Sequence, residues 1–173
     1  MKSLKAPLIG IDRHRLTTDG DGITTLVAFH GCPLRCAYCI NSQCFKAKPI
    51  GSITLKALLN RLMPDNLYFL ATGGGVTFGG GEPLLYSDFI ALFAQQMPKK
   101  WNVTIETSLN VPIRNLMDIA HYVKLFVVDI KDMKTDIYKR YTGKDNSNVM
   151  SNLKWLEDHG YSSKVLIRIP LIR

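Results

Sequence analysis

Short apolar runs alternate with stretches of helical periodicity along most of this chain, and no other feature constrains the fold as strongly. The runs carry the β-branched and aromatic residues that are typical of buried strands. They predict five strands, at residues 26–29, 76–78, 103–107, 125–130 and 165–172. Strands that alternate with single helices form right-handed βαβ units, which build a parallel sheet. The sequence therefore predicts an α/β protein.

Four amphipathic stripes separate these strands and have recognisable ends. The first follows Thr54, a candidate N-cap, and the second follows Ser87, another candidate N-cap, and stops at Pro98. The third begins with Pro112, which suits the first turn of a helix, and the fourth is closed by Gly160. Their apolar residues are interpreted as core: Leu55, Leu58, Leu59, Leu62, Phe89, Leu92, Phe93, Met97, Ile113, Leu116, Met117, Ala120, Val149, Leu153 and Leu156.

Length and composition are those of an ordinary globular domain. The 173 residues are 46% hydrophobic and 21% charged, which fits one domain over 1–173 and excludes a disordered or collagen-like chain. The net charge of +8 is scattered, so no nucleic-acid partner is expected. Without an apolar signal core or a membrane-length apolar stretch, we expect a cytoplasmic protein with no membrane partner. Because the chain stops inside an apolar strand, we expect it to be the front part of a longer protein.

All four cysteines lie within thirteen residues, at Cys32, Cys36, Cys39 and Cys44. A disulfide framework would spread them along the chain, whereas clustered thiols are typical of metal ligands. The first three follow a predicted strand, at the end where α/β folds bind ligands. Three thiolates on one tight loop suit three corners of an iron–sulfur cube. Two alternatives stay open, in which Cys44 completes either a zinc site or an electron-transfer cluster.

The spacing in CPLRCAYC, with Tyr38 before the last cysteine, resembles the signature of the radical SAM superfamily. Further blocks make the chain similar to the glycyl-radical-enzyme activating enzymes of the pyruvate formate-lyase activating type. These blocks are DGDGITTLVAFHGCPLRCAYCIN, GGGVTFGGGEPLLY, ETS at 106–108, VVDIKDM at 127–133, YTG at 141–143 and IRIPLI at 167–172. The resemblance runs almost end to end. It implies a radical SAM partial (βα)6 TIM-like barrel, here ending after the fifth strand.

The resemblance also implies a set of site residues. Cys32, Cys36 and Cys39 would ligate a [4Fe-4S] cluster whose open iron binds S-adenosyl-L-methionine (SAM), with Lys131 at the SAM carboxylate as a further catalytic residue. Cys44 would be a free or buried thiol. The remaining SAM-binding residues implied by the resemblance are Tyr38, Asn41, Gly80, Gly81, Glu82 and Pro83, of which the last four would hold the methionine amino group.

Several polar and charged side chains are expected to lie together at the ends of the third and fourth predicted strands. By resemblance, Glu106, Thr107 and Asp129 would lie by a monovalent-cation site near the SAM carboxylate, and Arg168 would face the barrel interior. Carboxylates close to another carboxylate need a positive charge between them, which is the physical case for the cation.

The function implied by the resemblance is that of an anaerobic oxidoreductase, a radical SAM activase. It would cleave SAM reductively and generate a glycyl radical on a partner enzyme, with electrons from a flavodoxin- or ferredoxin-type reductant. Two other functions stay open. One is a radical SAM enzyme with a small-molecule substrate, and the other is an inactive, truncated iron–sulfur or zinc-binding domain.

Overall fold

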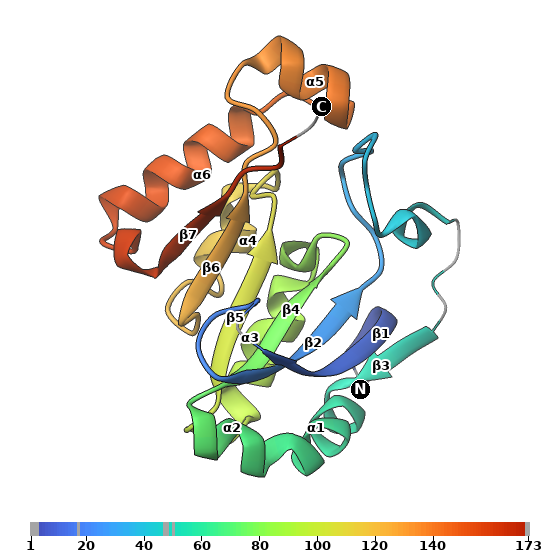
Figure 1. Ribbon diagram of the computed structural model, residues 1–173, viewed down its shortest axis with the longest axis vertical. Helices are drawn as coiled ribbons and strands as arrows, with labels where there is room; N and C mark the ends of the chain where they lie inside the picture. The colour runs from blue at the N-terminus through green and yellow to red at the C-terminus, as the bar shows by residue number, and fades with distance from the viewer. Residues whose placement is uncertain (1–3, 17, 47–48, 50, 172–173) are drawn as a thin grey trace.

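The computed structural model describes residues 4–16, 18–46, 49 and 51–171. Seven strands form one sheet in the order β3-β1-β2-β4-β5-β6-β7 (Figure 1). The strands are β1 (Lys5–Leu16), β2 (Ile23–Phe29), β3 (Gly51–Thr54), β4 (Gly75–Gly80), β5 (Asn102–Thr107), β6 (Leu125–Asp129) and β7 (Val165–Arg168). The α-helices are α1 (Leu55–Leu62), α2 (Asn66–Thr72), α3 (Ser87–Gln96), α4 (Ile113–Met117), α5 (Thr135–Thr142) and α6 (Ser147–Asp158).

The five predicted strands make up the parallel part of the sheet. β2, β4, β5, β6 and β7 pair in parallel in that order, which confirms the α/β class and the partial TIM-like barrel. β7 is shorter than predicted, because it ends at Arg168; Ile172 lies outside the described residues. Leu166 and Ile167 are also 48% and 43% exposed. β7, the last strand of the sheet, is therefore less buried than its apolar run predicts.

The two antiparallel strands were not predicted. β1 pairs with β2 on one side and with β3 on the other. Its second half is largely exposed and carries the charged run Asp12–Arg15, so it lacks the apolar signal of a buried strand. Register shifts between Leu8 and Gly10 and between Asp12 and Arg15 also break its alternation.

Several helix ends follow local sequence chemistry. α1 begins where predicted, and the Thr54 hydroxyl oxygen accepts a hydrogen bond from the backbone N–H of Ala57 at 3.3 Å. α3 begins one residue earlier than predicted, because Ser87 is its first residue and Tyr86 is its N-cap. α2 and α5 were not predicted. Among the described residues, no helix combines the length and the hydrophobicity that a membrane span requires.

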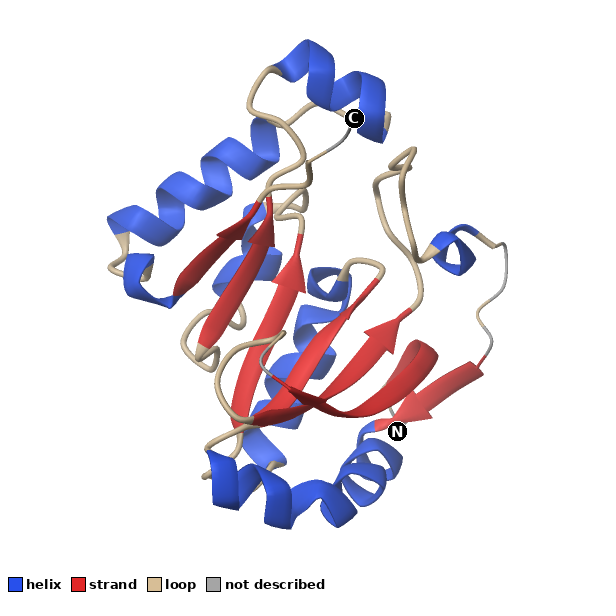
Figure 2. Ribbon diagram, viewed as in Figure 1, coloured by secondary structure: helices blue, strands red, loops and turns tan. Residues whose placement is uncertain are grey.

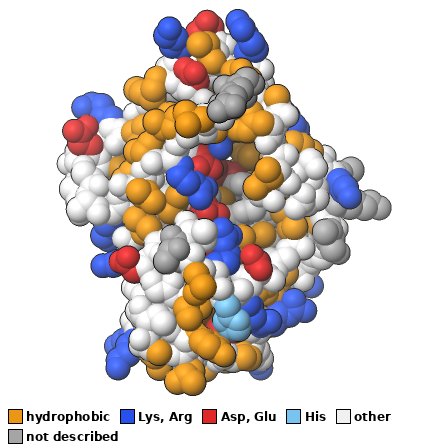
Figure 3. Space-filling view, viewed as in Figure 1, with side chains coloured by type: hydrophobic (Ala, Val, Ile, Leu, Met, Phe, Trp, Pro, Cys, Tyr) orange, Lys and Arg blue, Asp and Glu red, His pale blue; other side chains and the backbone are white. Residues whose placement is uncertain are grey.

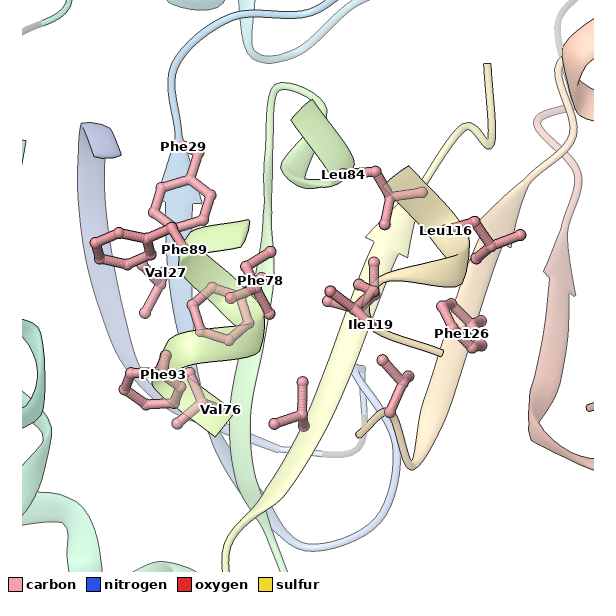
Figure 4. Packing of buried hydrophobic residues seen from close by; sticks show 14 of the residues in the cluster. Val27, Phe29, Val76, Phe78, Leu84, Phe89, Phe93, Leu116, Ile119 and Phe126 are labelled. Carbon is pink, nitrogen blue, oxygen red and sulfur yellow. The ribbon is translucent and has the colours of Figure 1, made fainter. Parts of the chain in front are cut away.

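Figure 2 shows helices behind the parallel strands, and the hydrophobic core lies between these two layers. Alternate residues of each strand, such as Val76 and Phe78 of β4, point toward Phe89 and Phe93 of α3 (Figure 4). The residues between them point to the opposite face, because side chains alternate along a strand. In this way the helices occupy one face of the sheet and leave the other face free to form a site.

Candidate functional site

A cavity of about 860 Å³ opens on the face of the sheet opposite the core, near the carboxyl ends of the parallel strands. Acidic and basic side chains lie inside this opening (Figure 3). The structure brings the predicted site residues together here, with two exceptions, Glu82 and Pro83. The predicted residues that line the cavity are Cys32, Cys36, Tyr38, Cys39, Asn41, Gly80, Gly81, Glu106, Thr107, Asp129 and Lys131.

The cysteine loop follows β2 and is held against the end of α5. The backbone N–H of Arg35 donates to the carbonyl oxygen of Thr142 at 2.8 Å, and that of Ala37 donates to Tyr141 at 2.9 Å. Within the loop, the N–H of Cys39 donates to the carbonyl oxygen of Cys36 at 3.1 Å. These backbone bonds fix the loop that carries the cysteines and orient it toward the cavity.

On its other side the cysteine loop packs on the glycine-rich end of β4. The N–H of Gly81 donates to the carbonyl oxygen of Phe29, and the N–H of Glu82 donates to that of Gly31, both at 2.8 Å. A Cβ atom at Gly81 would lie 2.0 Å from the Gly31 carbonyl oxygen. The Asn41 amide donates to the carbonyl oxygen of Gly80 at 2.9 Å. The glycines are therefore needed for two backbone segments to meet beside the cavity.

Burial disfavours the thiolate form of two cysteines in this loop. Burial, followed by the charge of Glu82, raises the pKa of Cys32 to about 12. Burial also raises the pKa of Cys36, although the charge of Lys131 opposes the shift. A neutral thiol becomes a thiolate when a metal cation binds, so this donor set fits an iron–sulfur cluster. Within the described ranges, no group of three or more His, Cys, Asp or Glu side chains is arranged to hold a single metal ion.

Cys44 belongs to the same cavity. It is buried in a short 3-10 helix, Ser42–Phe45, and lines the wall with the other three cysteines. Burial, and then the charge of Cys39, raises the pKa of its thiol. The structure therefore leaves Cys44 within the site, where a substitution can test whether it binds metal.

Glu82 lies behind the cavity wall, with its carboxylate fully buried. Its Oε1 accepts hydrogen bonds from the hydroxyl of Thr107 at 2.7 Å and the N–H of Leu84 at 3.2 Å. Its Oε2 accepts from the hydroxyl and the N–H of Ser108, at 2.6 Å and 3.0 Å. Burial raises the pKa of Glu82 despite these four donors. The carboxylate thus ties the glycine-rich loop to the end of β5, and Pro83 begins the following 3-10 helix.

Four charged side chains meet on the cavity floor. Arg168 is paired in register with Asp129 across β7 and β6, and its Nε and Nη2 donate to the two Asp129 oxygens at 2.7 Å and 3.2 Å. Its Nη1 donates to Oε1 of Glu106 at 2.9 Å. The Lys131 ammonium lies 3.2 Å from Oδ2 of Asp129. Two carboxylates and two cations are therefore joined in one network.

The pKa values of the two carboxyl groups reflect this network. Burial alone would raise the pKa of Asp129, but the hydrogen bonds of Arg168 and the charge of Lys131 outweigh it, so the pKa is lowered. The pKa of Glu106 is raised by burial and by the charge of Asp19, although Arg168 opposes the shift. Asp129 is thus the more firmly ionised of the two.

Some cavity residues were missed by the sequence analysis, chiefly those of β1 and the turn after it. Asp12 and Arg15 line the cavity, and Arg15 Nη2 lies 2.8 Å from Oδ1 of the buried Asp19. The apolar residues at the start of β1, in the sequence APLIGI, are a signal that could have revealed this strand. Tyr38 was predicted, and its ring lies near the ring of Tyr141 and 5.9 Å from the Lys131 ammonium.

Comparisons with known proteins agree with this geometry. Residues 26–173 match the family model of the radical SAM superfamily. The pyruvate formate-lyase-activating enzymes of Staphylococcus aureus strains USA300 and MRSA252 are 33% identical over 150 residues, 82% of this chain and 60% of theirs. The chain thus spans about 60% of the length of these curated relatives.

Two solved structures are also similar. A domain of the pyruvate-formate lyase-activating enzyme from Bacteroides vulgatus is 26% identical, with a TM-score of 0.51 over 57% of this chain and 61% of that one. Streptococcus suis SuiB, bound to precursor peptide SuiA, is 19% identical with a TM-score of 0.60 over 83% of this chain and 31% of that one. The second likeness concerns the fold alone.

Proposed function

The chain belongs to the radical SAM superfamily, and from that premise we propose that it activates a glycyl radical enzyme of the pyruvate formate-lyase type. The observation that carries the proposal is the single cavity in which the cysteine loop, the glycine-rich strand end and the charged floor meet. The similarity of this chain to the activating enzymes of Staphylococcus aureus and Bacteroides vulgatus supports the choice of substrate class.

In this proposal, the residues of the cavity divide into two groups around the cofactors. Cys32, Cys36 and Cys39 hold a [4Fe-4S] cluster, and Tyr38 covers it from the side of α5. When bound, the cluster and SAM supply reductive cleavage of the SAM sulfur–C5′ bond, which yields methionine and an adenosyl species that takes a hydrogen atom from a glycine Cα. Cofactors of this kind carry the chemistry, while the protein provides orientation and excludes water.

The second group binds SAM. Gly80 and Gly81 give the methionine amino group close access to the backbone, because neither carries a Cβ. Lys131 faces the methionine carboxylate, and Asn41 holds the segment after the cluster next to the adenine. Pro83 and Glu82 do not line the cavity, and they support SAM binding by fixing the conformation of the glycine-rich loop. The glycine-bearing segment of the partner enters from the open side of the cavity, and a flavodoxin- or ferredoxin-type protein delivers the electron.

The first experiment asks whether the site is an open iron–sulfur cluster. The chain is reconstituted anaerobically with iron and sulfide, reduced with dithionite and measured by EPR with and without SAM. We expect a [4Fe-4S]⁺ signal that changes when SAM is added. A signal that ignores SAM, or stoichiometric zinc in place of iron, would refute the proposed chemistry.

Cysteine substitutions provide a matched control. Each of Cys32→Ser, Cys36→Ser and Cys39→Ser should lose most of the bound iron. Cys44→Ser, at a cysteine lining the same cavity, should retain both the iron and the response to SAM. If Cys44→Ser loses the cluster as well, Cys44 is a ligand and the proposed open iron does not exist.

The substrate is tested last. The reconstituted protein is incubated with SAM, reductant and a pyruvate formate-lyase, and the mixture is examined by EPR for a glycyl radical and by chromatography for 5′-deoxyadenosine. Both should appear together. Release of 5′-deoxyadenosine with a small metabolite but never with the lyase would favour the small-molecule function instead.

A further inference from the structure

A positive charge is required where Glu106 and Asp129 approach each other on the cavity floor. The resemblance assigned this charge to a monovalent cation held by Glu106, Thr107 and Asp129. Whether the residues fit such an ion depends on whether their oxygen atoms are free to bind it, since a cation of this kind needs several oxygen ligands at once. Their hydrogen bonds answer this question.

The side-chain oxygens in question are largely committed to other groups. Both oxygens of Asp129 accept hydrogen bonds from Arg168, and Oδ2 also contacts Lys131. Oε1 of Glu106 accepts from the same guanidinium. The hydroxyl of Thr107 donates to Glu82 and accepts from the N–H of Leu109 at 2.9 Å. The side chains therefore do not fit a monovalent cation.

The guanidinium of Arg168 has the geometry to replace the ion. It lies between the two carboxylates, with two N–H groups on Asp129 and one on Glu106, so a single planar fork bridges both. The charges balance, since two carboxylates face Arg168 and Lys131. The in-register pairing of Asp129 with Arg168 on adjacent strands holds the fork in place.

We propose that Arg168 takes the place of the monovalent cation, so that this chain binds SAM independently of sodium or potassium. Arg168 is a positioning residue here: it neutralises Glu106 and Asp129 and leaves Lys131 to face the cofactor carboxylate. This inference rests on the proposed SAM site, but it concerns only the source of the positive charge.

The test compares SAM affinity in sodium, potassium and choline chloride at equal ionic strength, by calorimetry on the anaerobically reconstituted protein. The wild type should bind equally well in all three salts. In Arg168→Met, affinity in choline should fall about 10-fold, as expected for the loss of charge-assisted hydrogen bonds, and recover partly in sodium or potassium. Arg168→Lys keeps the positive charge but loses the planar guanidinium. Its affinity for SAM in choline should lie between those of the wild type and Arg168→Met. Arg114→Met, at an exposed arginine, should match the wild type.

A wild-type affinity that drops several-fold in choline would overturn the inference, as would an Arg168→Met variant that behaves like the wild type in choline. A second measurement, which needs neither the cluster nor SAM, distinguishes failure of the inference about Arg168 from failure of the proposed function. The sodium NMR linewidth is recorded on the unreconstituted protein while potassium is added. Potassium-displaceable broadening should be absent in the wild type and present in Arg168→Met. Broadening in the wild type that Glu106→Gln abolishes would show that a cation occupies the site after all.

If the wild type binds no SAM in any salt, the proposed function fails while the linewidth experiment still decides the source of the charge. Melting curves show whether Arg168→Met remains folded. If it does not, Arg168→Lys provides the same comparison, because its single ammonium leaves carboxylate oxygens open to sodium. Cation-independent SAM binding in Arg168→Lys, without displaceable broadening, would then contradict the need for the guanidinium fork.

Discussion

Glu82→Gln tests whether the buried carboxylate at the end of the glycine-rich loop holds the site together. Each oxygen of Glu82 accepts one hydroxyl and one backbone N–H, from Leu84 on one side and Ser108 on the other. A hydroxyl can rotate to become an acceptor, but a backbone N–H cannot. Whichever way the glutamine amide is turned, its NH₂ group therefore faces a backbone donor in a fully buried position.

The substitution leaves one buried N–H without a hydrogen-bond partner, which should lower the free energy of unfolding by about 1–3 kcal/mol. In a chain of this size that corresponds to a melting temperature lowered by about 2–12 °C. Removing a buried charge works in the opposite direction, because burial raises the pKa of Glu82 and so penalises its ionised form. We expect the lost hydrogen bond to prevail, since a protonated carboxyl could still accept from both backbone N–H groups and an amide cannot.

The measurement is thermal unfolding of the wild type and Glu82→Gln, with Glu157→Gln as the control at an exposed glutamate. The control should melt with the wild type. Because the folded-state pKa of Glu82 is raised above its usual 4.5, the stability that this group contributes is fully present below that value and is lost as pH rises through the folded pKa. The difference in melting temperature between the wild type and Glu82→Gln should therefore become smaller as the pH rises. A variant as stable as the wild type at every pH would refute the reasoning.

Three further predictions concern single substitutions. Gly81→Ala should lower the melting temperature and the iron content, because its Cβ would lie 2.0 Å from the carbonyl oxygen of Gly31, whereas Gly10→Ala, with nothing within 4 Å, should retain its iron. The lowered pKa of Asp129 means that its contribution to stability is present above the usual value of 3.8 and is lost as pH falls through the folded pKa. The free energies of unfolding of wild type and Asp129→Asn, from denaturant titrations, should thus converge as the pH falls below 3.8; a constant difference would contradict the pKa shift. Asn152→Ala removes the donor to two carbonyl oxygens, at 2.8 Å and 2.9 Å, and should cost about 2 kcal/mol in a denaturant titration; an unchanged midpoint would show that water replaces the amide.

The parallel strands could be predicted from the sequence because their apolar runs are a local signal of burial. The same reasoning could not find β1, whose stability comes from pairing with two neighbours rather than from its own hydrophobicity. Nor could it find α2, which begins directly after the 3-10 turn Met63–Asp65, or α5, whose sequence TDIYKRYT is mostly polar. Boundaries set by tertiary pairing, such as the end of β7 at Arg168, are likewise invisible in a linear pattern.

The candidate site shows the same division. The resemblance carried by the cysteine and glycine blocks predicted most of the residues that line the cavity, with Glu82 and Pro83 as exceptions. Sequence reasoning did not predict that Glu82 faces inward to Ser108, or that Arg168 bridges Asp129 and Glu106. Those contacts depend on which strands are neighbours and on the direction of each side chain, and both are properties of the folded sheet.

The backbone bonds from Arg35 and Ala37 to Thr142 and Tyr141 join an early segment of the chain to a late one. A ribosome releases the amino-terminal part first, so the thiols emerge long before the residues that shape their loop have been made. Iron delivered during that interval would meet an unformed set of ligands. If the chain takes up iron as proposed, the ligand loop can be completed only after α5 has been synthesised.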